Sequence, residues 1–294
     1  MEFQELLSEK IAELLHELSV LPFDNMHHEG ALAGPAVLTN YTSWLIIAFV
    51  AVAVMFLVAS NVAKKRLAAT ETSGNPSELA PAGRFMGMVE FGVEFIREMA
   101  SDVIGEKDGP KYVPLLATMF FLILISNMFG LIPGGKSFAG SMGGTVALAL
   151  ITWIVFVVIG FKKNGFVGYF KSLIPSGVRE MPLAGRLILG GFLFLLEFIS
   201  TFLIRPLTLS VRLFANMYAG HIVLGIFSAF VMLFWPLVQP ALQFSIGGVA
   251  VGAVSILFLV IMYAFELFVA FIQAYVFTIL TAVYIQSSEH AGDH

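Results

Sequence analysis

The chain has 294 residues, of which 58% are hydrophobic, 12% are charged and none is cysteine, and its formal net charge at pH 7 is −4. A soluble domain carries about one quarter charged residues, so this composition excludes an ordinary soluble protein. The lack of cysteine excludes disulfides, thiolate nucleophiles and Cys-ligated metals, and the absence of a basic patch argues against a nucleic-acid partner.

Several uninterrupted apolar runs reach the roughly 20 residues that cross a hydrocarbon core as a helix. None has the alternating pattern of about ten residues that marks a strand of a membrane barrel. The sequence therefore predicts an all-α, polytopic membrane protein surrounded by lipid. We expect one membrane domain over residues 42–294, with about three perpendicular spans, one interfacial amphipathic helix and two long tilted antiparallel helices.

Residues 1–41 form a separate N-terminal segment, whose first 20 residues carry glutamates among apolar side chains. Over residues 1–20 the apolar positions recur at helical spacing, which indicates an amphipathic helix at a surface. The segment lacks the basic start and continuous apolar centre of a signal peptide, and we expect it to lie outside the cytoplasm. His27 and His28 are adjacent and do not share a helical face, which argues against a metal site.

The first predicted span covers residues 42–63 and is followed at once by Lys64-Lys65-Arg66. Basic clusters stay on the cytoplasmic side, so this cluster places the N-terminus outside. A polar linker over residues 70–81 leads into residues 83–111, which mix large apolar side chains with charged ones. This second segment is too polar to span, and we expect it to lie along the cytoplasmic interface.

Two further spans are predicted over residues 112–132 and 145–161. The Gly- and Ser-rich stretch between them carries one lysine, which suits an external loop, and the third span returns to the basic pair Lys162-Lys163. Asn127 interrupts the second span. An amide in a membrane helix commonly bonds to a neighbouring helix, and a position facing water is the alternative.

Residues 187–234 form an apolar run too long for one perpendicular helix at about 1.5 Å per residue. It must tilt, bend or break, and Pro206 offers a place to bend because proline removes a backbone donor. Trp235-Pro236 indicates a reversal near an interface. A second long helix over residues 242–286 then returns, and it leaves a short cytoplasmic tail.

Arg212 is the most unusual residue of the chain, because no Lys, Arg, Asp or Glu lies between it and Glu266. A guanidinium near the bilayer centre costs roughly 2.5–3.5 kcal/mol, so it normally faces a partner or a wet cavity. Thr208, Arg212 and Asn216 are spaced by four and share one helical face. We expect a carboxylate from another chain to reach this face. An internal ion pair or a side chain that reaches the interface is the alternative.

His221 follows Arg212 by nine residues and points about 180° away from it on a straight helix. On the returning helix, Glu266 and Gln273 are seven apart and share a face within about 20°. His221 and Glu266 are titratable groups in otherwise uncharged sequence, which indicates a proton relay. A histidine that makes an ordinary buried hydrogen bond is the alternative reading.

Glu197 lies on the cytoplasmic half of the first long helix. It could line a route for protons toward the cytoplasm, or it could form an ion pair with Arg205 or Arg186. The sequence leaves these two roles open.

Residues 204–221, with residues 272–278 downstream, closely resemble the a subunit of the F-type ATP synthase, the membrane stator beside the rotating c-ring. The resemblance extends over about 85–287 and leaves out the first 40 residues. It implies a proton-translocating subunit with no ATP chemistry of its own, no cofactor and no metal, whose partners are the c-ring and the b subunits of the peripheral stalk.

The resemblance also implies a role for each polar residue of the long helices. Arg212 matches the essential arginine that faces the c-ring carboxylate, and Asn216 and Gln273 match the polar residues beside that contact. His221 and Glu266 match the pair that lines the half-channel for proton uptake. Gly130 stands where some members have an aspartate, so a relay role at that position is absent here.

Elementary electrostatics agrees with these roles. An arginine stays protonated, so Arg212 cannot relay protons and acts as a fixed positive charge that favours the ionised form of a passing carboxylate. We therefore expect two half-channels kept apart by Arg212, which couple proton flow to rotation and ATP synthesis. Whether the ion is a proton or sodium stays open.

The sequence argues against two other functions. A self-contained secondary transporter would be built from repeats, which this sequence lacks, and a purely structural scaffold would not need Arg212, His221 and Glu266 together. No transit peptide is apparent, which favours a bacterial plasma membrane over a mitochondrion.

Overall fold

The computed structural model describes residues 40–73, 83–132, 135, 137–172, 183–234 and 246–289. Within these ranges the chain is helical and has no strand. The elements are α3 (Asn40–Ser73), α4 (Arg84–Ile104), α5 (Gly109–Leu131), the 3-10 turn η2 (Phe138–Gly140), α6 (Met142–Ser172), α8 (Leu183–Ile199), the π-helical turn η3 (Ser200–Ile204), α9 (Arg205–Phe234) and α10 (Ile246–Glu289). The N-terminal amphipathic segment predicted for residues 1–41 lies almost entirely outside the described residues.

Five stretches of these helices are long and apolar enough to cross a membrane, which confirms the predicted all-α, polytopic class. They are Ser43–Ala68, Gly109–Leu131, Met142–Lys171, Leu189–Val231 and Ala250–Glu289. The fourth is continuous through η3, and where the sequence predicted a bend at Pro206 the structure has a π turn that ends two residues before the proline.

The helices extend past the charged residues at which the sequence analysis ended the spans. α3 continues through Lys64-Lys65-Arg66, and Arg66 Nη1 donates to Glu90 Oε1 of α4 at 2.7 Å. α6 likewise passes Lys162 and Lys163 and changes direction at Gly165, where φ is 68°. Lysine and arginine are good helix formers, so a basic cluster marks a membrane boundary and does not mark the end of a helix.

The interfacial segment expected over residues 83–111 is divided in two. α4 ends at Ile104 and is followed by Gly105, whose φ of 115° favours glycine, and α5 begins at Gly109 with Pro110 in its first turn. Proline suits that position because it lacks the N–H that the first turn leaves unpaired. The second span therefore starts earlier than predicted, and only α4 remains as the amphipathic helix.

The loop predicted between the second and third spans contains a buried stretch at residues 137–139. Ser137 is 1% exposed, and Phe138 and Ala139 of η2 pack into the core. The polar composition of this loop reflects bonds inside the protein: Ser126 Oγ accepts from the Phe138 amide at 3.3 Å, and Ser137 Oγ accepts from the Ala139 amide at 3.1 Å.

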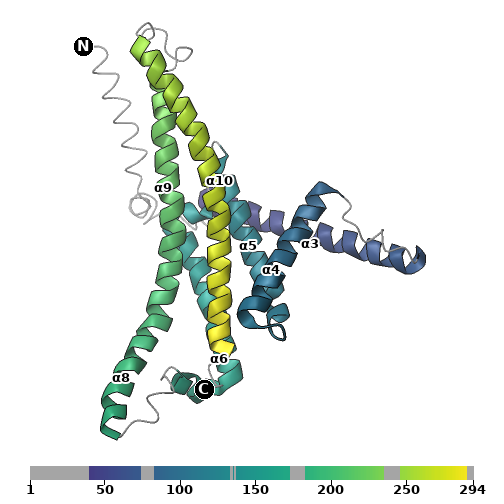
Figure 1. Cartoon of the computed structure of the whole chain (residues 1–294), viewed down its shortest axis with the longest axis vertical. Helices are drawn as coiled ribbons and strands as arrows, with labels where there is room; N and C mark the ends of the chain where they lie inside the picture. Colours follow the sequence, from purple (N-terminus) through teal and green to yellow (C-terminus); the bar gives the residue numbers. More distant parts are fainter. Residues whose placement is uncertain are drawn as a thin grey trace, which may run out of the picture.

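α9 and α10 lie side by side and antiparallel along the longest axis of the molecule, and α8 continues the line of α9 (Figure 1). α10 has 44 residues, and at about 1.5 Å per residue a helix of that length is about twice as long as a ~30 Å hydrocarbon core. α3 runs at a steep angle to this pair (Figure 1). If α3 crosses the bilayer directly, we therefore expect α9 and α10 to cross it obliquely.

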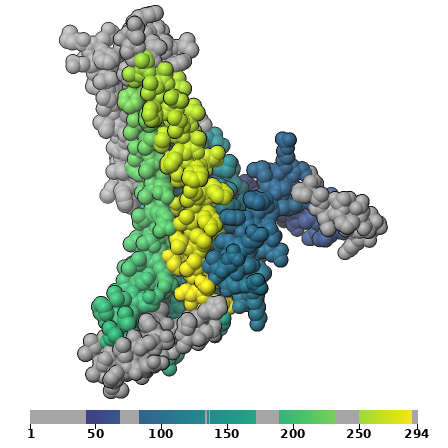
Figure 2. Space-filling view, viewed as in Figure 1, coloured from purple at the N-terminus to yellow at the C-terminus, as the bar shows by residue number. Residues whose placement is uncertain are grey.

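The C-terminal end of α10 is tied to α5 and α6. Glu289 accepts a hydrogen bond from Tyr112 Oη at 2.9 Å through Oε2, and Lys163 Nζ lies 3.3 Å from its Oε1. α10 therefore extends to Glu289 and includes Ser287 and Ser288, three residues that the sequence predicted to lie in the tail. On the side seen in Figure 2, α9 and α10 form one continuous face.

Candidate functional site

The face of α9 that carries Arg212 is not covered by other described parts of the chain. Arg212 and Asn216 are exposed, as is Thr208, whose hydroxyl donates to the carbonyl of Ile204 at 2.8 Å. Among the described residues, no acidic side chain forms an ion pair with Arg212. The alternative of an internal ion pair therefore finds no support in the described part of the chain, and the guanidinium is presented outward.

Asn216 connects this open face to α10. Its Nδ2 donates to Gln273 Oε1 at 2.5 Å, and Gln273 is 3% exposed. Gln273 Nε2 is buried without a hydrogen-bond partner among the described residues. An unpaired buried donor usually costs about 1–3 kcal/mol, so the amide pair is a site at which an added acceptor would be stabilising.

Glu266 is buried against the backbone of α9. It is 5% exposed, and its carboxylate lies where a Cβ on Gly220 would be. Only a residue without a side chain leaves this space, so Gly220 is what allows the carboxylate to reach α9. Because Gly220 directly precedes His221, the two titratable residues predicted as a relay lie at the same level of the helix pair.

His221 lies on the side of α9 that faces α5. A Cβ added to Gly130 of α5 would be 3.2 Å from His221 Nε2 and 2.8 Å from Ser137 Cβ, and it would overlap Met217. The space that an aspartate would need at position 130 is therefore filled by these three side chains. This arrangement explains in physical terms why glycine is the residue that fits there.

Ser137 and Asn127 form a buried polar cluster beside Gly130. Ser137 Oγ donates to Asn127 Oδ1 at 3.1 Å and lies 3.4 Å from Ser126 Oγ. Asn127 is 1% exposed, so its bond is internal and joins α5 to the loop before η2. Sequence reasoning missed Ser137, because a serine in a Gly-rich stretch reads as a loop residue. Its nearness to Asn127 in the chain was the only available signal.

Glu197 forms an ion pair with Arg205, which was one of the two roles left open. Arg205 Nη2 donates to Glu197 Oε1 at 2.6 Å, and the Thr201 hydroxyl donates to the same oxygen at 3.4 Å. The Arg205 guanidinium also lies 5.2 Å from the centre of the Tyr284 ring on α10. A role in proton release stays a prediction.

Two separate polar clusters therefore flank Arg212 along α9. One is Glu197 with Arg205, and the other is Glu266 with His221. Arg205 precedes it by seven residues and His221 follows it by nine, which at about 1.5 Å per residue is about 10 Å and about 13 Å along the helix. No Asp, Glu, His, Lys or Arg of α9 lies between Arg212 and either Arg205 or His221. The arrangement could receive protons at one end and give them up at the other, with a permanent cation in the middle.

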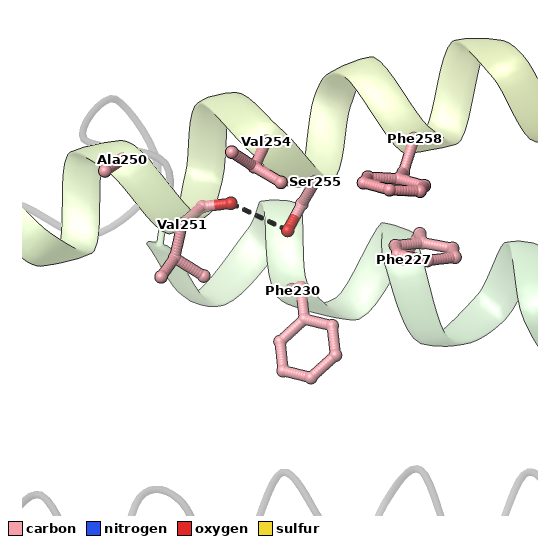
Figure 3. Close-up of a pocket in the computed structure, with 7 residues that line it drawn as sticks. All are labelled: Phe227, Phe230, Ala250, Val251, Val254, Ser255 and Phe258. Atoms are coloured by element: carbon pink, nitrogen blue, oxygen red, sulfur yellow. Dashed lines mark hydrogen bonds between the residues drawn. The ribbon is translucent and has the colours of Figure 1, made fainter.

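Beyond His221, α9 and α10 enclose an apolar groove (Figure 3). The Phe227 and Phe258 rings stack there at a centroid distance of 5.4 Å. The one hydroxyl among the lining residues, on Ser255, donates to the Val251 carbonyl at 2.8 Å (Figure 3). Nothing that lines this groove can titrate, so the candidate site ends at Glu266 and His221. The lining residues are Phe227, Phe230, Ala250, Val251, Val254, Ser255 and Phe258.

Because the Glu266 carboxylate occupies the space beside Gly220, a side chain at position 220 is expected to destabilise the protein. We expect Gly220→Ala to lower the free energy of unfolding by about 1–3 kcal/mol relative to the same change at Gly225, because the methyl group at position 220 overlaps the carboxylate and must displace it. Thermal unfolding of the purified protein in detergent measures this change.

Gly225→Ala is the matched control, because it makes the same change on the same helix where nothing lies within 4 Å of the new methyl group. Alanine is the better helix former by about 1 kcal/mol, so this control should be neutral or slightly stabilising. Equal effects at the two positions would contradict the placement of Glu266.

A protein-family model and several known proteins match this chain over most of its length. The family model described as ATP synthase A chain matches residues 42–286. An ATP synthase subunit a of Rhodobacter capsulatus is 37% identical over 254 residues, which is 86% of this chain and 93% of the relative. One from Rhodopseudomonas palustris strain HaA2 is 34% identical over 283 residues, or 96% and 99% of the two chains. One from Frankia alni is 38% identical over 220 residues, or 74% and 71%.

Proposed function

Since this chain belongs to the ATP synthase subunit a family and is a multi-pass membrane subunit of the F-type enzyme, we propose that Arg212 separates two half-channels that lead protons to and from the c-ring. The c-ring and the peripheral stalk are its partners in the complex. The observation that carries the proposal is an exposed arginine with no acidic partner in the described residues, placed between two polar clusters.

Uptake proceeds through Glu266 and His221. A proton from outside protonates this pair, which hands it to a c-ring carboxylate. The neutral carboxylic acid then leaves the aqueous site and rotates through lipid, which an ionised group could not do without a large cost. Glu266 and His221 suit the task because a carboxylate and an imidazole can each bind and release a proton.

Release occurs when the carboxylic acid returns to the other side of Arg212. The guanidinium stabilises the ionised carboxylate, so the proton leaves toward the cytoplasm past Glu197 and Arg205. The planar fork of Arg212 can bind a carboxylate with two parallel hydrogen bonds, while Asn216 and Gln273 offer amides beside it. Each proton that crosses 100 mV supplies about 2.3 kcal/mol for rotation.

The orientation follows the basic residues. Lys64-Lys65-Arg66 of α3 and Lys162-Lys163 of α6 lie on the cytoplasmic side, together with the end of α10 that Lys163 binds. The N-terminus is then outside and the C-terminus is cytoplasmic, in a bacterial plasma membrane.

Reconstitution tests the need for a partner. We expect the purified chain alone to leave the proton permeability of vesicles unchanged, and the chain together with its c-ring to conduct protons under an imposed membrane potential. A pH-sensitive dye inside the vesicles measures the flux, and the c-ring alone is the control. Equal flux with and without the ring would instead identify a self-contained transporter.

A further inference from the structure

The π turn η3 leaves one backbone carbonyl without a donor from its own helix. The Arg205 amide donates to the Ser200 carbonyl, five residues back, and no longer serves the Thr201 carbonyl. The other donor that could reach the Thr201 carbonyl is the amide of residue 206, which is a proline and has no N–H. In a membrane-spanning helix such a carbonyl needs a partner from elsewhere in the protein.

Trp153 of α6 supplies that partner. Its indole N–H donates to the Thr201 carbonyl at 3.2 Å, and Thr201 is 1% exposed. The indole ring also meets Phe202 edge to face, with ring centroids 5.6 Å apart. π turns are rare in proteins, and this one has a donor aimed at the carbonyl that it frees.

The π turn changes the direction of every side chain that follows it. One extra residue in the turn rotates the rest of the helix by about 100° relative to a continuous α-helix. Glu197 and Arg205 are eight residues apart and would lie about 80° apart on a continuous helix, yet they form an ion pair at 2.6 Å. Arg212 follows Arg205 by seven residues, so both lie within about 20° of one direction.

We propose that Trp153 is a positioning residue, whose N–H holds the π turn and thereby sets the direction in which Arg212 points. Without this bond the turn relaxes to an α-helix, and each later residue takes the direction now held by its successor. Position 210 would then take the exposed direction of Val211, and position 219 would take the buried direction of Gly220. The effect of this rotation on coupling rests on the function proposed above for Arg212.

Thiol labelling tests the rotation directly, because the chain has no cysteine of its own. Ser210→Cys and Ala219→Cys serve as single reporters in the full chain purified in detergent. We expect Trp153→Phe to raise the labelling rate at position 210 and to lower it at position 219, each by about tenfold, the factor that corresponds to one buried hydrogen bond left unmade. General loosening would raise both rates and would overturn the proposal, as would unchanged rates.

Trp44→Phe is the matched control, because Trp44 lies in a membrane helix and packs on Phe129 at a centroid distance of 5.8 Å. It should leave both reporters unchanged. If Trp153→Phe does not fold, the benzothienyl analogue of tryptophan, which replaces the N–H by sulfur and keeps the shape, gives the same test.

The assembled complex separates this proposal from the proposed function. We expect Trp153→Phe to lower the ratio of ATP-driven proton pumping to ATP hydrolysis by about tenfold, in line with the labelling change. Opposite labelling shifts with normal pumping would contradict the role of Arg212 and would leave the role of Trp153 standing. Loss of pumping without labelling shifts would overturn the role of Trp153.

Discussion

Arg212→Ala is expected to abolish proton-driven ATP synthesis in vesicles that contain the assembled complex. A guanidinium and a carboxylate 4 Å apart attract each other by about 4 kcal/mol at an effective dielectric constant of 20, which corresponds to about a thousandfold in the ionisation equilibrium. Without the cation, the ionised form of the returning c-ring carboxylate is no longer stabilised, so the carboxylic acid keeps its proton. Synthesis driven by an imposed pH difference measures the effect, with ATP hydrolysis as the check on assembly.

Arg212→Lys is the informative companion variant. Lysine keeps the charge but is a point charge without the planar fork of arginine. We expect a small residual rate, because the charge still favours ionisation while the paired hydrogen bonds are lost. Normal coupled synthesis in Arg212→Ala would contradict the assignment, since nothing else on the exposed side of α9 carries a positive charge between Arg205 and the end of the helix.

Helical periodicity predicted the parts of the site that lie within one helix. The spacing of Thr208, Arg212 and Asn216 placed them on one face, and all three are exposed. The seven-residue spacing of Glu266 and Gln273 placed them together, and both are buried toward α9. These predictions succeeded because a straight α-helix fixes the direction of a side chain from its number alone.

The features that depend on contacts between distant segments were not predicted. The π turn at Thr201 depends on an indole 48 residues earlier, and the sequence around Pro206 offered only an unspecified bend. The Glu197–Arg205 pair was left open for the same reason, because eight residues of α-helix would separate the two side chains. The fit of Glu266 over Gly220 likewise needs the register of α9 against α10, which no local pattern contains.

The positions of the basic clusters did not predict where the helices end. Lys64 and Lys163 lie inside helices, because a charged side chain can leave the lipid while its backbone stays helical. A basic cluster can therefore predict an orientation of the chain without giving the end of a helix.

Glu266→Gln is expected to slow proton uptake by about a hundredfold, the lower range of what a positioned acid or base contributes to proton transfer. Glutamine has nearly the shape of glutamate, so it keeps the fit over Gly220 and the packing of α9 on α10. It cannot bind and release a proton, so only the relay is lost. The initial rate of ATP-driven proton pumping measures the change, and an intact complex with unchanged pumping would contradict the relay.

A double variant decides whether His221 belongs to the same relay. If Glu266 and His221 pass one proton in succession, removing either interrupts the same path, and Glu266→Gln with His221→Gln should be no slower than the slower single variant. If they act on separate paths, the two losses should multiply, because independent effects add in free energy. The geometry favours the first result, since the Glu266 carboxylate lies against Gly220 and His221 is the next residue of the chain.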